Sequence, residues 1–147
     1  MKAAVLTALG AFSIEEREPP EVEAGGVRVR VEACGVCPSD VRVFRHGHAR
    51  VRLPHVLGHE VAGVVEEVGE GTQGCRPGDR VSLVPRISCG QCSACRKDLY
   101  SHCPHARTVG FDLPGGFAEQ VLIPAPGPAV GVLIPVGAGV SCEEAAL

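Results

Sequence analysis

Four cysteines lie within fifteen residues in a C-x2-C-x2-C-x7-C pattern, and no other spacing in the chain points as directly to chemistry. The short spacers, which include Gly90, form tight turns, so that all four thiols can face one point. Zn²⁺ bound by four thiolates is tetrahedral, with Zn–S distances of about 2.3 Å, and leaves no position for a substrate. The pattern therefore favours a structural zinc site at Cys89, Cys92, Cys95 and Cys103.

Two other uses of these cysteines compete with zinc. Disulfides are one, but residues 1–20 show no secretory signal, and clustered cysteines in a cytoplasmic protein more often bind metal. An iron–sulfur cluster is the other, because the run ends in Cys103-Pro104. The last spacer is three residues in bacterial ferredoxins but seven here, and the chain has no second array.

The composition suits one small globular domain. Of its 147 residues 45% are hydrophobic but only 3% are aromatic, so the core must be aliphatic. Gly 19 and Pro 12 indicate many turns, below the ~25–30% typical of disorder. The net charge of −3, without a basic stripe along the chain, gives little support for a nucleic-acid partner. Apolar runs are too short for a transmembrane helix, so we expect a cytoplasmic protein without membrane contacts.

Short segments of period-two alternation predict a β-sandwich or barrel. The clearest is Val27–Val31, in which valine and arginine alternate. A short helix at 41–45, capped by Ser39 or Asp40, is also expected. The cysteine lobe, about residues 86–110, is expected to project from the barrel. Further strands are expected at 2–9, 13–18, 61–68, 80–84, 117–123 and 130–135.

The C-terminal residues predict the start of a helix. Ser141 and Glu144 fit the S-x-x-E capping box, yet only three residues follow, too few for a stable helix. We therefore expect that the single domain of residues 1–147 is cut within an element that longer relatives continue. The run from Gly137 to Gly139 lacks the third glycine of a dinucleotide fingerprint and has no room for a βαβ unit after it, so we expect no Rossmann domain in this chain.

Cys37 and His59 are further candidate metal ligands. A thiolate and an imidazole suit zinc, but two ligands are too few for a tight site. Taken singly, Cys37 is better explained as a small buried side chain, and His59 as a hydrogen-bonded histidine at the start of a strand.

Five motifs, in this order along the chain, resemble those of the zinc-dependent medium-chain alcohol dehydrogenases. The resemblance is to the N-terminal, GroES-like catalytic domain and covers nearly the whole chain. It implies a mainly β fold, a partly open barrel with short helices and a zinc-binding lobe. The motifs are Gly-x-Cys-x-Ser-Asp at 35–40, Gly-His-Glu at 58–60, Pro-Gly-Asp-Arg-Val at 77–81, the cysteine array, and Gly-Gly-Phe-Ala-Glu at 115–119.

The resemblance also implies roles for residues near Cys37. Cys37 and His59 would be ligands of a catalytic zinc, with Glu60 beside the metal as an alternate ligand or neighbouring carboxylate. Asp40 would hydrogen-bond the other ring nitrogen of His59, and Ser39 would contact the substrate hydroxyl and begin a proton relay. A solvated surface position is the alternative for both acids.

The chain departs from the family pattern in two respects. Relatives supply a further zinc ligand, and a Rossmann domain, from residues that would follow Leu147. The nearby Glu143 and Glu144 are explained by the preference of acids for the first turn of a helix. Arg42 stands where many members carry a histidine that passes the proton to solvent, and arginine does not deprotonate. His46, His48 or water are the alternative carriers.

By resemblance, then, the chain is the catalytic part of an NAD(P)-dependent oxidoreductase. Zinc would activate an alcohol, and hydride would pass to NAD or NADP bound by a Rossmann domain in cis or in trans. The partners implied are a small-molecule alcohol, that Rossmann domain and further copies in a homo-oligomer. We expect the isolated chain to be inactive. The alternative is a non-enzymatic zinc-binding or interaction module derived from such a domain.

Overall fold

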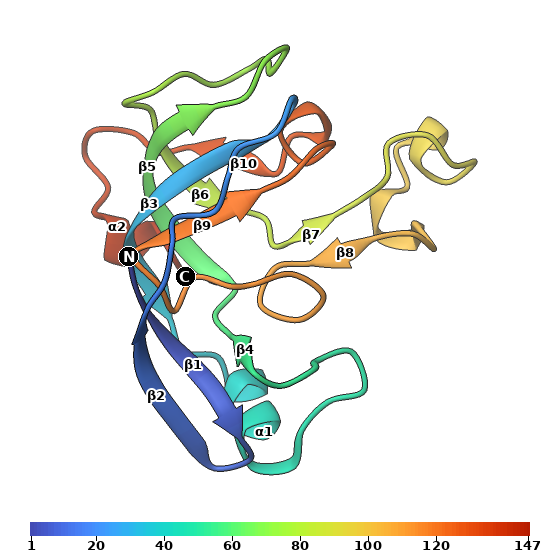
Figure 1. Cartoon of the computed structure of the whole chain (residues 1–147). Coiled ribbons are helices and arrows are strands. Elements are labelled where there is room, and N and C mark those ends of the chain that lie inside the picture. The colour runs from blue at the N-terminus through green and yellow to red at the C-terminus, as the bar shows by residue number, and fades with distance from the viewer.

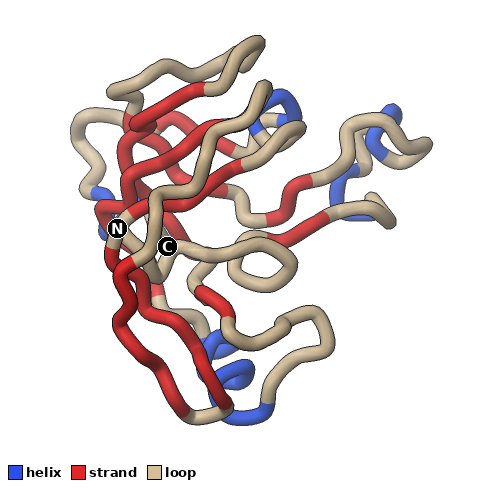
Figure 2. Tube along the Cα trace, viewed as in Figure 1, coloured by secondary structure: helices blue, strands red, loops and turns tan.

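The computed structural model describes all 147 residues, which form a twisted antiparallel β structure with a projecting lobe (Figure 1). Figure 2 shows that loops connect most of the short strands, as the glycine and proline content predicts. The strands are β1 Lys2–Ala8, β2 Ala11–Glu16, β3 Val27–Gly35, β4 His55–Val56, β5 Glu60–Val68, β6 Arg80–Leu83, β7 Arg86–Ile87, β8 Arg107–Thr108, β9 Gln120–Ile123 and β10 Leu133–Pro135. The helices are α1 Pro38–His46, α2 Cys142–Ala145 and the 3₁₀ turns η1 Cys95–Lys97, η2 Tyr100–His102 and η3 Pro128–Val130.

Two sheets form a partly open barrel. The larger has the order β10-β6-β5-β3-β9, and the smaller has the order β2-β1-β4. They meet where the amide of Ala4 donates to the carbonyl of Phe117 at 2.7 Å and Ala3 bridges Ala118. The predicted fold class, mainly β with short helices and a projecting cysteine lobe, is confirmed.

The barrel core is aliphatic because alternate residues of the long strands point inward. In β3, Val27 and Val29 are fully buried, whereas the intervening Arg28 pairs with Glu66 on the outside at 2.9 Å. Burying each such side chain contributes about 1.5–3 kcal/mol. The main cluster comprises Val27, Val29, Val61, Val65, Val81, Leu83, Ile87, Val109, Val121, Ile123 and Val132.

Several elements differ from the sequence prediction. β3 continues to Gly35, four residues beyond the predicted end, because Cys34 and Gly35 pair with β5. β2 begins at Ala11 and β9 only at Gln120, set by their pairing with β1 and β3. The predicted 130–135 strand is divided into η3 and β10. β4, β7 and β8 were not predicted, since two residues are too few to show an alternation.

The first helix also starts earlier than predicted. α1 begins at Pro38, whose fixed φ suits the first helical position, so its N-cap is Cys37 and not Ser39 or Asp40. Asp40 instead occupies the third helical position, where its carboxylate accepts a hydrogen bond from the Cys37 amide at 3.0 Å. With nine residues, α1 is the longest helix, and no helix is long and apolar enough to cross a membrane.

The cysteine lobe projects from the barrel on a two-stranded stem (Figure 1). β7 and β8 pair antiparallel at its base, with Arg86 opposite Thr108, and the loop between them contains η1 and η2. At the C-terminus the predicted capping box is present: Ser141 Oγ accepts from the Glu144 amide at 3.2 Å, and Glu144 accepts from the Ser141 amide at 2.9 Å.

Candidate metal centres

The four cysteines of the lobe converge on one point. Their sulfur atoms all lie within 4.8 Å of one another. The Cys89–Cys103 and Cys92–Cys95 pairs are both 3.5 Å apart, and Cys89–Cys95 is 4.0 Å. A tetrahedron with Zn–S distances of about 2.3 Å has S···S edges of about 3.8 Å, which these separations match. All eight cysteines are free thiols, so the spacing fits a metal and not a disulfide.

The backbone of the lobe is arranged to stabilise thiolates. Hydrogen bonds from the amides of Gln91 and Cys92 lower the pKa of Cys89 to about 6, and the amide of Cys95 lowers that of Cys92. Burial, by contrast, raises the pKa of Cys95 to about 12. Thiolates at Cys89 and Cys92 need a compensating cation, which a divalent metal would supply.

A second donor group lies inside the main body, where β3, α1 and β5 meet. Cys37 Sγ, the His59 ring and the Glu60 carboxylate approach within 4.8 Å of one another. Cys37 follows the end of β3, and Glu60 is the first residue of β5, opposite Gly35 in the β3–β5 register. A Cβ added at Gly35 would collide with the Glu60 carboxylate, so glycine there lets that carboxylate keep its position. A thiolate, an imidazole and a carboxylate are all donors that zinc accepts.

Ser39 and Asp40 flank the two ring nitrogens of His59. Ser39 Oγ is 3.5 Å from Nε2. Asp40 Oδ1 is 3.4 Å from Nδ1, although the pair is not aligned as a hydrogen bond and Nδ1, which is buried, has no other partner. The buried Asp40 carboxylate also accepts from the Cys37 and Gly58 amides, at 3.0 and 3.4 Å. Asp40 therefore ties the start of α1 to the residue before His59.

Cys34 lies near this group but is not a metal ligand candidate. Burial raises the pKa of its thiol to about 12, reinforced by the negative charge of Asp40. Its sulfur packs against Gly58 and Gly116, where an added Cβ would lie 2.9 and 3.1 Å from it. Cys34 is thus a neutral packing residue beneath the donor group.

The sequence patterns did not single out Phe111, which covers one side of the donor group. Its ring centroid is 5.6 Å from that of His59 and 5.2 Å from that of His48, which meets it edge-on. Phe111 is almost fully buried, in the loop after β8. It is 52 positions from His59, and no local spacing signals such a contact.

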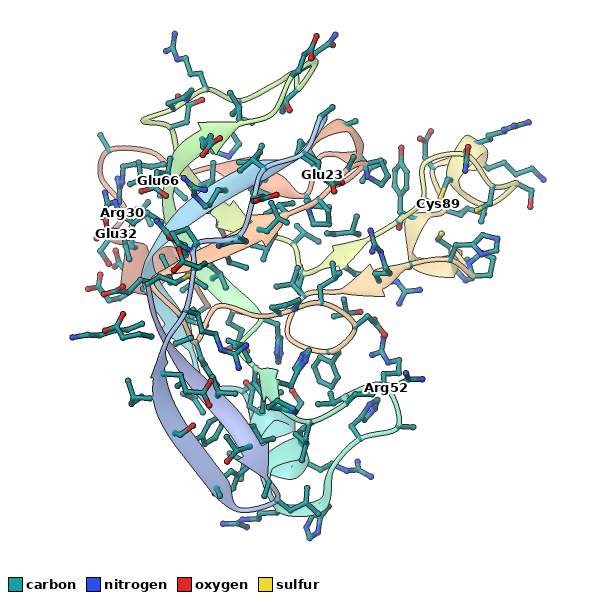
Figure 3. The ribbon with its side chains drawn as sticks, viewed as in Figure 1. Glu23, Arg30, Glu32, Arg52, Glu66 and Cys89 are labelled. Atoms are coloured by element: carbon teal, nitrogen blue, oxygen red, sulfur yellow. The ribbon has the colours of Figure 1, made fainter.

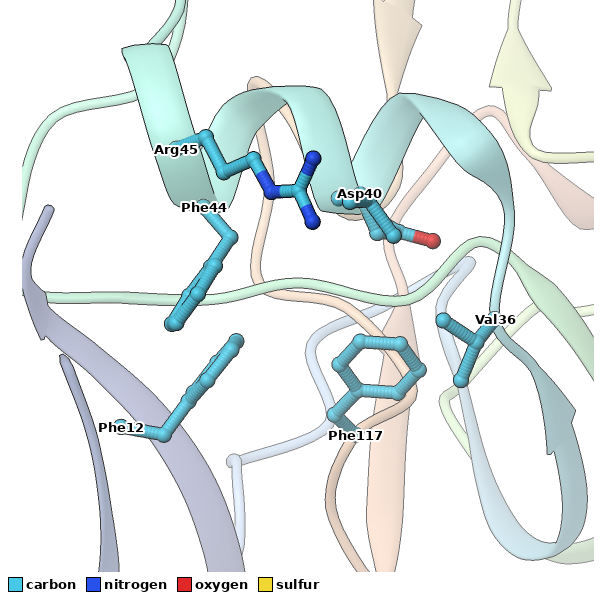
Figure 4. Close-up of a pocket in the computed structure, with 7 residues that line it drawn as sticks. Phe12, Val36, Asp40, Phe44, Arg45 and Phe117 are labelled. Carbon is cyan, nitrogen blue, oxygen red and sulfur yellow. The ribbon is translucent and has the colours of Figure 1, made fainter. Parts of the chain in front are cut away.

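A cavity of about 280 Å³ lies beside α1, separate from the three donor side chains. Figure 4 shows Phe12 and Phe44 face to face on one wall, with Phe117 and Val36 on another. The ring centroids of the first pair are 5.4 Å apart. Of the residues implicated in chemistry only Asp40 lines this cavity, so it is an apolar surface feature and not the donor site itself.

Glu143 and Glu144 lie in the first turn of α2. The Ser141 amide, which donates to the Glu144 carboxylate, lowers the pKa of Glu144. Capping of α2 therefore accounts for Glu144 without a metal.

Comparison with known proteins identifies the family to which this fold belongs. Residues 23–135 match the family model described as "Alcohol dehydrogenase GroES-like domain". The chain is 40% identical over 129 residues to an alcohol dehydrogenase of Geobacillus stearothermophilus, covering 85% of this chain and 38% of that protein. Across the curated relatives compared, it spans only 32–38% of their length.

Solved structures share the whole fold. The crystal structure of AibC superposes with a TM-score of 0.90 at 41% identity, over 99% of this chain and 40% of that one. RspB of Escherichia coli CFT073, crystallised with NADH, superposes with a TM-score of 0.86 at 34% identity, over 99% and 41%. The chain therefore belongs to the alcohol dehydrogenase GroES-like domain family, and its fold is that of the N-terminal catalytic domain of zinc-type medium-chain alcohol dehydrogenases.

Proposed function

We propose that this chain is the catalytic-domain portion of a zinc-dependent alcohol dehydrogenase that oxidises an alcohol to an aldehyde or ketone. NAD or NADP would be bound by a Rossmann domain outside these 147 residues, in cis or in trans. The observation that carries the proposal is the convergence of Cys37, His59 and Glu60 within 4.8 Å, with Ser39 3.5 Å from the His59 ring.

Each residue of this group has a separate task. Cys37, His59 and Glu60 would hold zinc, which supplies Lewis-acid activation of the alcohol when bound. Cys37 is the N-cap residue of α1, so the helix fixes where its side chain begins. Asp40, 3.4 Å from Nδ1, would orient His59 once the two align as a hydrogen bond, which would leave Nε2 for the metal. Ser39 Oγ accepts the hydrogen bond of the substrate hydroxyl. Arg42 cannot carry the proton onward, which leaves His46, His48 or water for that step.

The four lobe cysteines would hold a second zinc with a structural role. Four thiolates close its coordination shell, so no substrate can reach it. The β7–β8 stem separates this lobe from the donor group in the main body (Figure 1).

Exposed apolar side chains support a partner domain. Phe12, Val36 and Val41 line the same apolar cavity beside α1 and are open to solvent, Val36 being 69% exposed. Such a cluster on one face is typical of an interaction surface. We propose that the nucleotide-binding domain, or a second copy of the chain, covers it.

The proposal has two independent tests. Cobalt(II) loading should give a sulfur-to-cobalt absorption band that weakens in Cys37→Ser, while the lobe keeps its own band; an unchanged spectrum would remove Cys37 from the ligand set. Hydride transfer should be absent for the isolated chain with NAD or NADP and present when the continuation of its reading frame, or a relative's Rossmann domain, is added. Intact cobalt binding without turnover in the assembled protein would favour the alternative, a non-enzymatic zinc-binding module.

A further inference from the structure

We propose that Arg50 binds an oxyanion group of the substrate, so that the alcohol oxidised here carries a phosphate or a carboxylate. This inference rests on the proposed function and names its substrate class.

Arg50 is held in place by contacts from the loop after β8. Its Nη1 donates to Asp112 Oδ2 at 2.8 Å and to Thr108 Oγ1 at 3.2 Å. The guanidinium carbon lies 5.2 Å from the centre of the Phe111 ring, a cation–π distance. The Arg50 amide donates to His48 Nδ1 at 3.1 Å, which fixes the backbone as well.

The loop that holds Arg50 is itself rigid. The Thr108 carbonyl accepts from the amides of Phe111, Asp112 and Leu113, and Asp112 Oδ2 accepts from the Thr108 amide at 2.8 Å. A guanidinium seated on such a turn loses little conformational entropy when it binds a ligand, which is the main cost for a free surface arginine.

Phe111 connects this seat to the donor group. The Arg50 guanidinium carbon lies 5.2 Å from the centre of the Phe111 ring, and the centre of the His59 ring lies 5.6 Å from it. The positive charge therefore lies no more than about 11 Å from the His59 ring. An alcohol with several bonds between its hydroxyl carbon and its charged group would bridge such a distance.

The surrounding segment is strongly basic. Between Val41 and His59 the chain has four arginines and no acidic residue, although its overall net charge is −3. Of these arginines only Arg50 has an ion-pair partner, Asp112, while Arg42, Arg45 and Arg52 have none. Figure 3 places Arg52 on the loop between α1 and β4. Positive charge gathered in one segment of the chain attracts anions.

Arg50 retains donors for a ligand. The protein uses only Nη1, so Nε and Nη2 remain free, and the side chain is 44% exposed. Two adjacent N–H groups on one edge of a guanidinium match the geometry of a carboxylate or phosphate. An arginine that only made the surface more soluble would need neither the hydrogen bonds to Asp112 and Thr108 nor the cation–π contact with Phe111.

The test uses the zinc-loaded 147-residue chain and requires no turnover. Binding of inorganic phosphate, glycerol 3-phosphate, glycerate and uncharged glycerol is measured by NMR of backbone amides and arginine side chains at low ionic strength, where screening is weak. The variants are Arg50→Gln, Arg50→Lys, and Arg96→Gln as a control, since Arg96 is exposed on the cysteine lobe and has no ion-pair partner.

We expect the anions, but not glycerol, to shift the Arg50 Nε–H signal and the amides of residues 108–112. Arg50→Gln should weaken anion binding about fivefold to tenfold, Arg50→Lys less, and Arg96→Gln not at all. Tighter binding of glycerol 3-phosphate than of glycerate would assign phosphate, and the reverse would assign carboxylate. Equal affinity in Arg50→Gln and Arg96→Gln, or no anion binding, would overturn the inference while leaving the cobalt and hydride-transfer results untouched.

Discussion

Replacing Gly58 by alanine should both destabilise the protein and disturb the candidate catalytic zinc site formed by Cys37, His59 and Glu60. Gly58 precedes His59 and has a φ of +93°, a conformation that side chains rarely adopt. An added Cβ would lie 2.6 Å from Phe117 Cδ1 and 2.9 Å from Cys34 Sγ. Both neighbours are packed, so the backbone carrying His59 must move.

Gly78 provides a matched control. Its φ is also +93°, but a Cβ there would meet no atom within 4 Å. Gly78→Ala should therefore show only the backbone strain, about 1–2 kcal/mol. Gly58→Ala should add overpacking of about 1–3 kcal/mol, a total of about 2–5 kcal/mol. At about 3–4 °C per kcal/mol for this length, the extra loss is about 3–12 °C in Tm.

The assay is unfolding followed by circular dichroism, with urea and heat, at a fixed zinc concentration because metal binding is coupled to folding. Zinc content after dialysis is measured on the same samples. Gly58→Ala should lose more stability than Gly78→Ala and should also lose zinc from the weaker site. Equal losses of stability in the two variants would show that the packing around Gly58 is not as described here.

Three further predictions concern the metals and pH. Cys103→Ala should remove about one tightly held zinc per chain and about 3 kcal/mol of stability. The control Cys75→Ala, which lies outside both donor groups, should leave the zinc content unchanged. Unchanged zinc content in Cys103→Ala would exclude the structural site. His59→Ala should remove only a second zinc that a chelator strips first from the wild type, because the group offers three protein donors instead of four; equal resistance of the two zincs would contradict this. Burial lowers the pKa of His55 below 6.5, and its buried Nε2 has no partner, so the unfolded chain takes up a proton more readily than the folded one. The free energy of unfolding should therefore fall as pH drops below about 6.5, and this part of the fall should vanish in His55→Asn. Urea titrations of both proteins at several pH values test this, and the same dependence of unfolding free energy on pH in both would contradict it.

Much of the fold followed from short-range patterns. The alternation in Val27–Val31 predicted β3, and the cysteine spacing predicted a lobe in which four sulfurs converge. The capping box predicted the start of α2 at Cys142. Each of these features depends on dihedral angles within a few residues, which the local sequence specifies. Strands of two residues, such as β4, carry no such pattern and form only because β1 provides a partner.

The donor group in the main body was accessible from the sequence only through its resemblance to a known family. Spacing alone does not bring Cys37 near His59; the register that sets Gly35 opposite Glu60 does so, together with Asp40, which bonds to residues on both segments.

By itself the sequence determined the local structural features of this protein: its alternating strands, the helix cap at Ser141 and the four-cysteine turn. Only the tertiary structure decided which side chains surround His59 and where the basic segment lies. Phe111 meets His59, and Arg50 meets Asp112, across more than fifty residues. Contacts of that kind depend on the packing of whole sheets and loops, because the entropy of closing a long loop is recovered only when many side chains pack together.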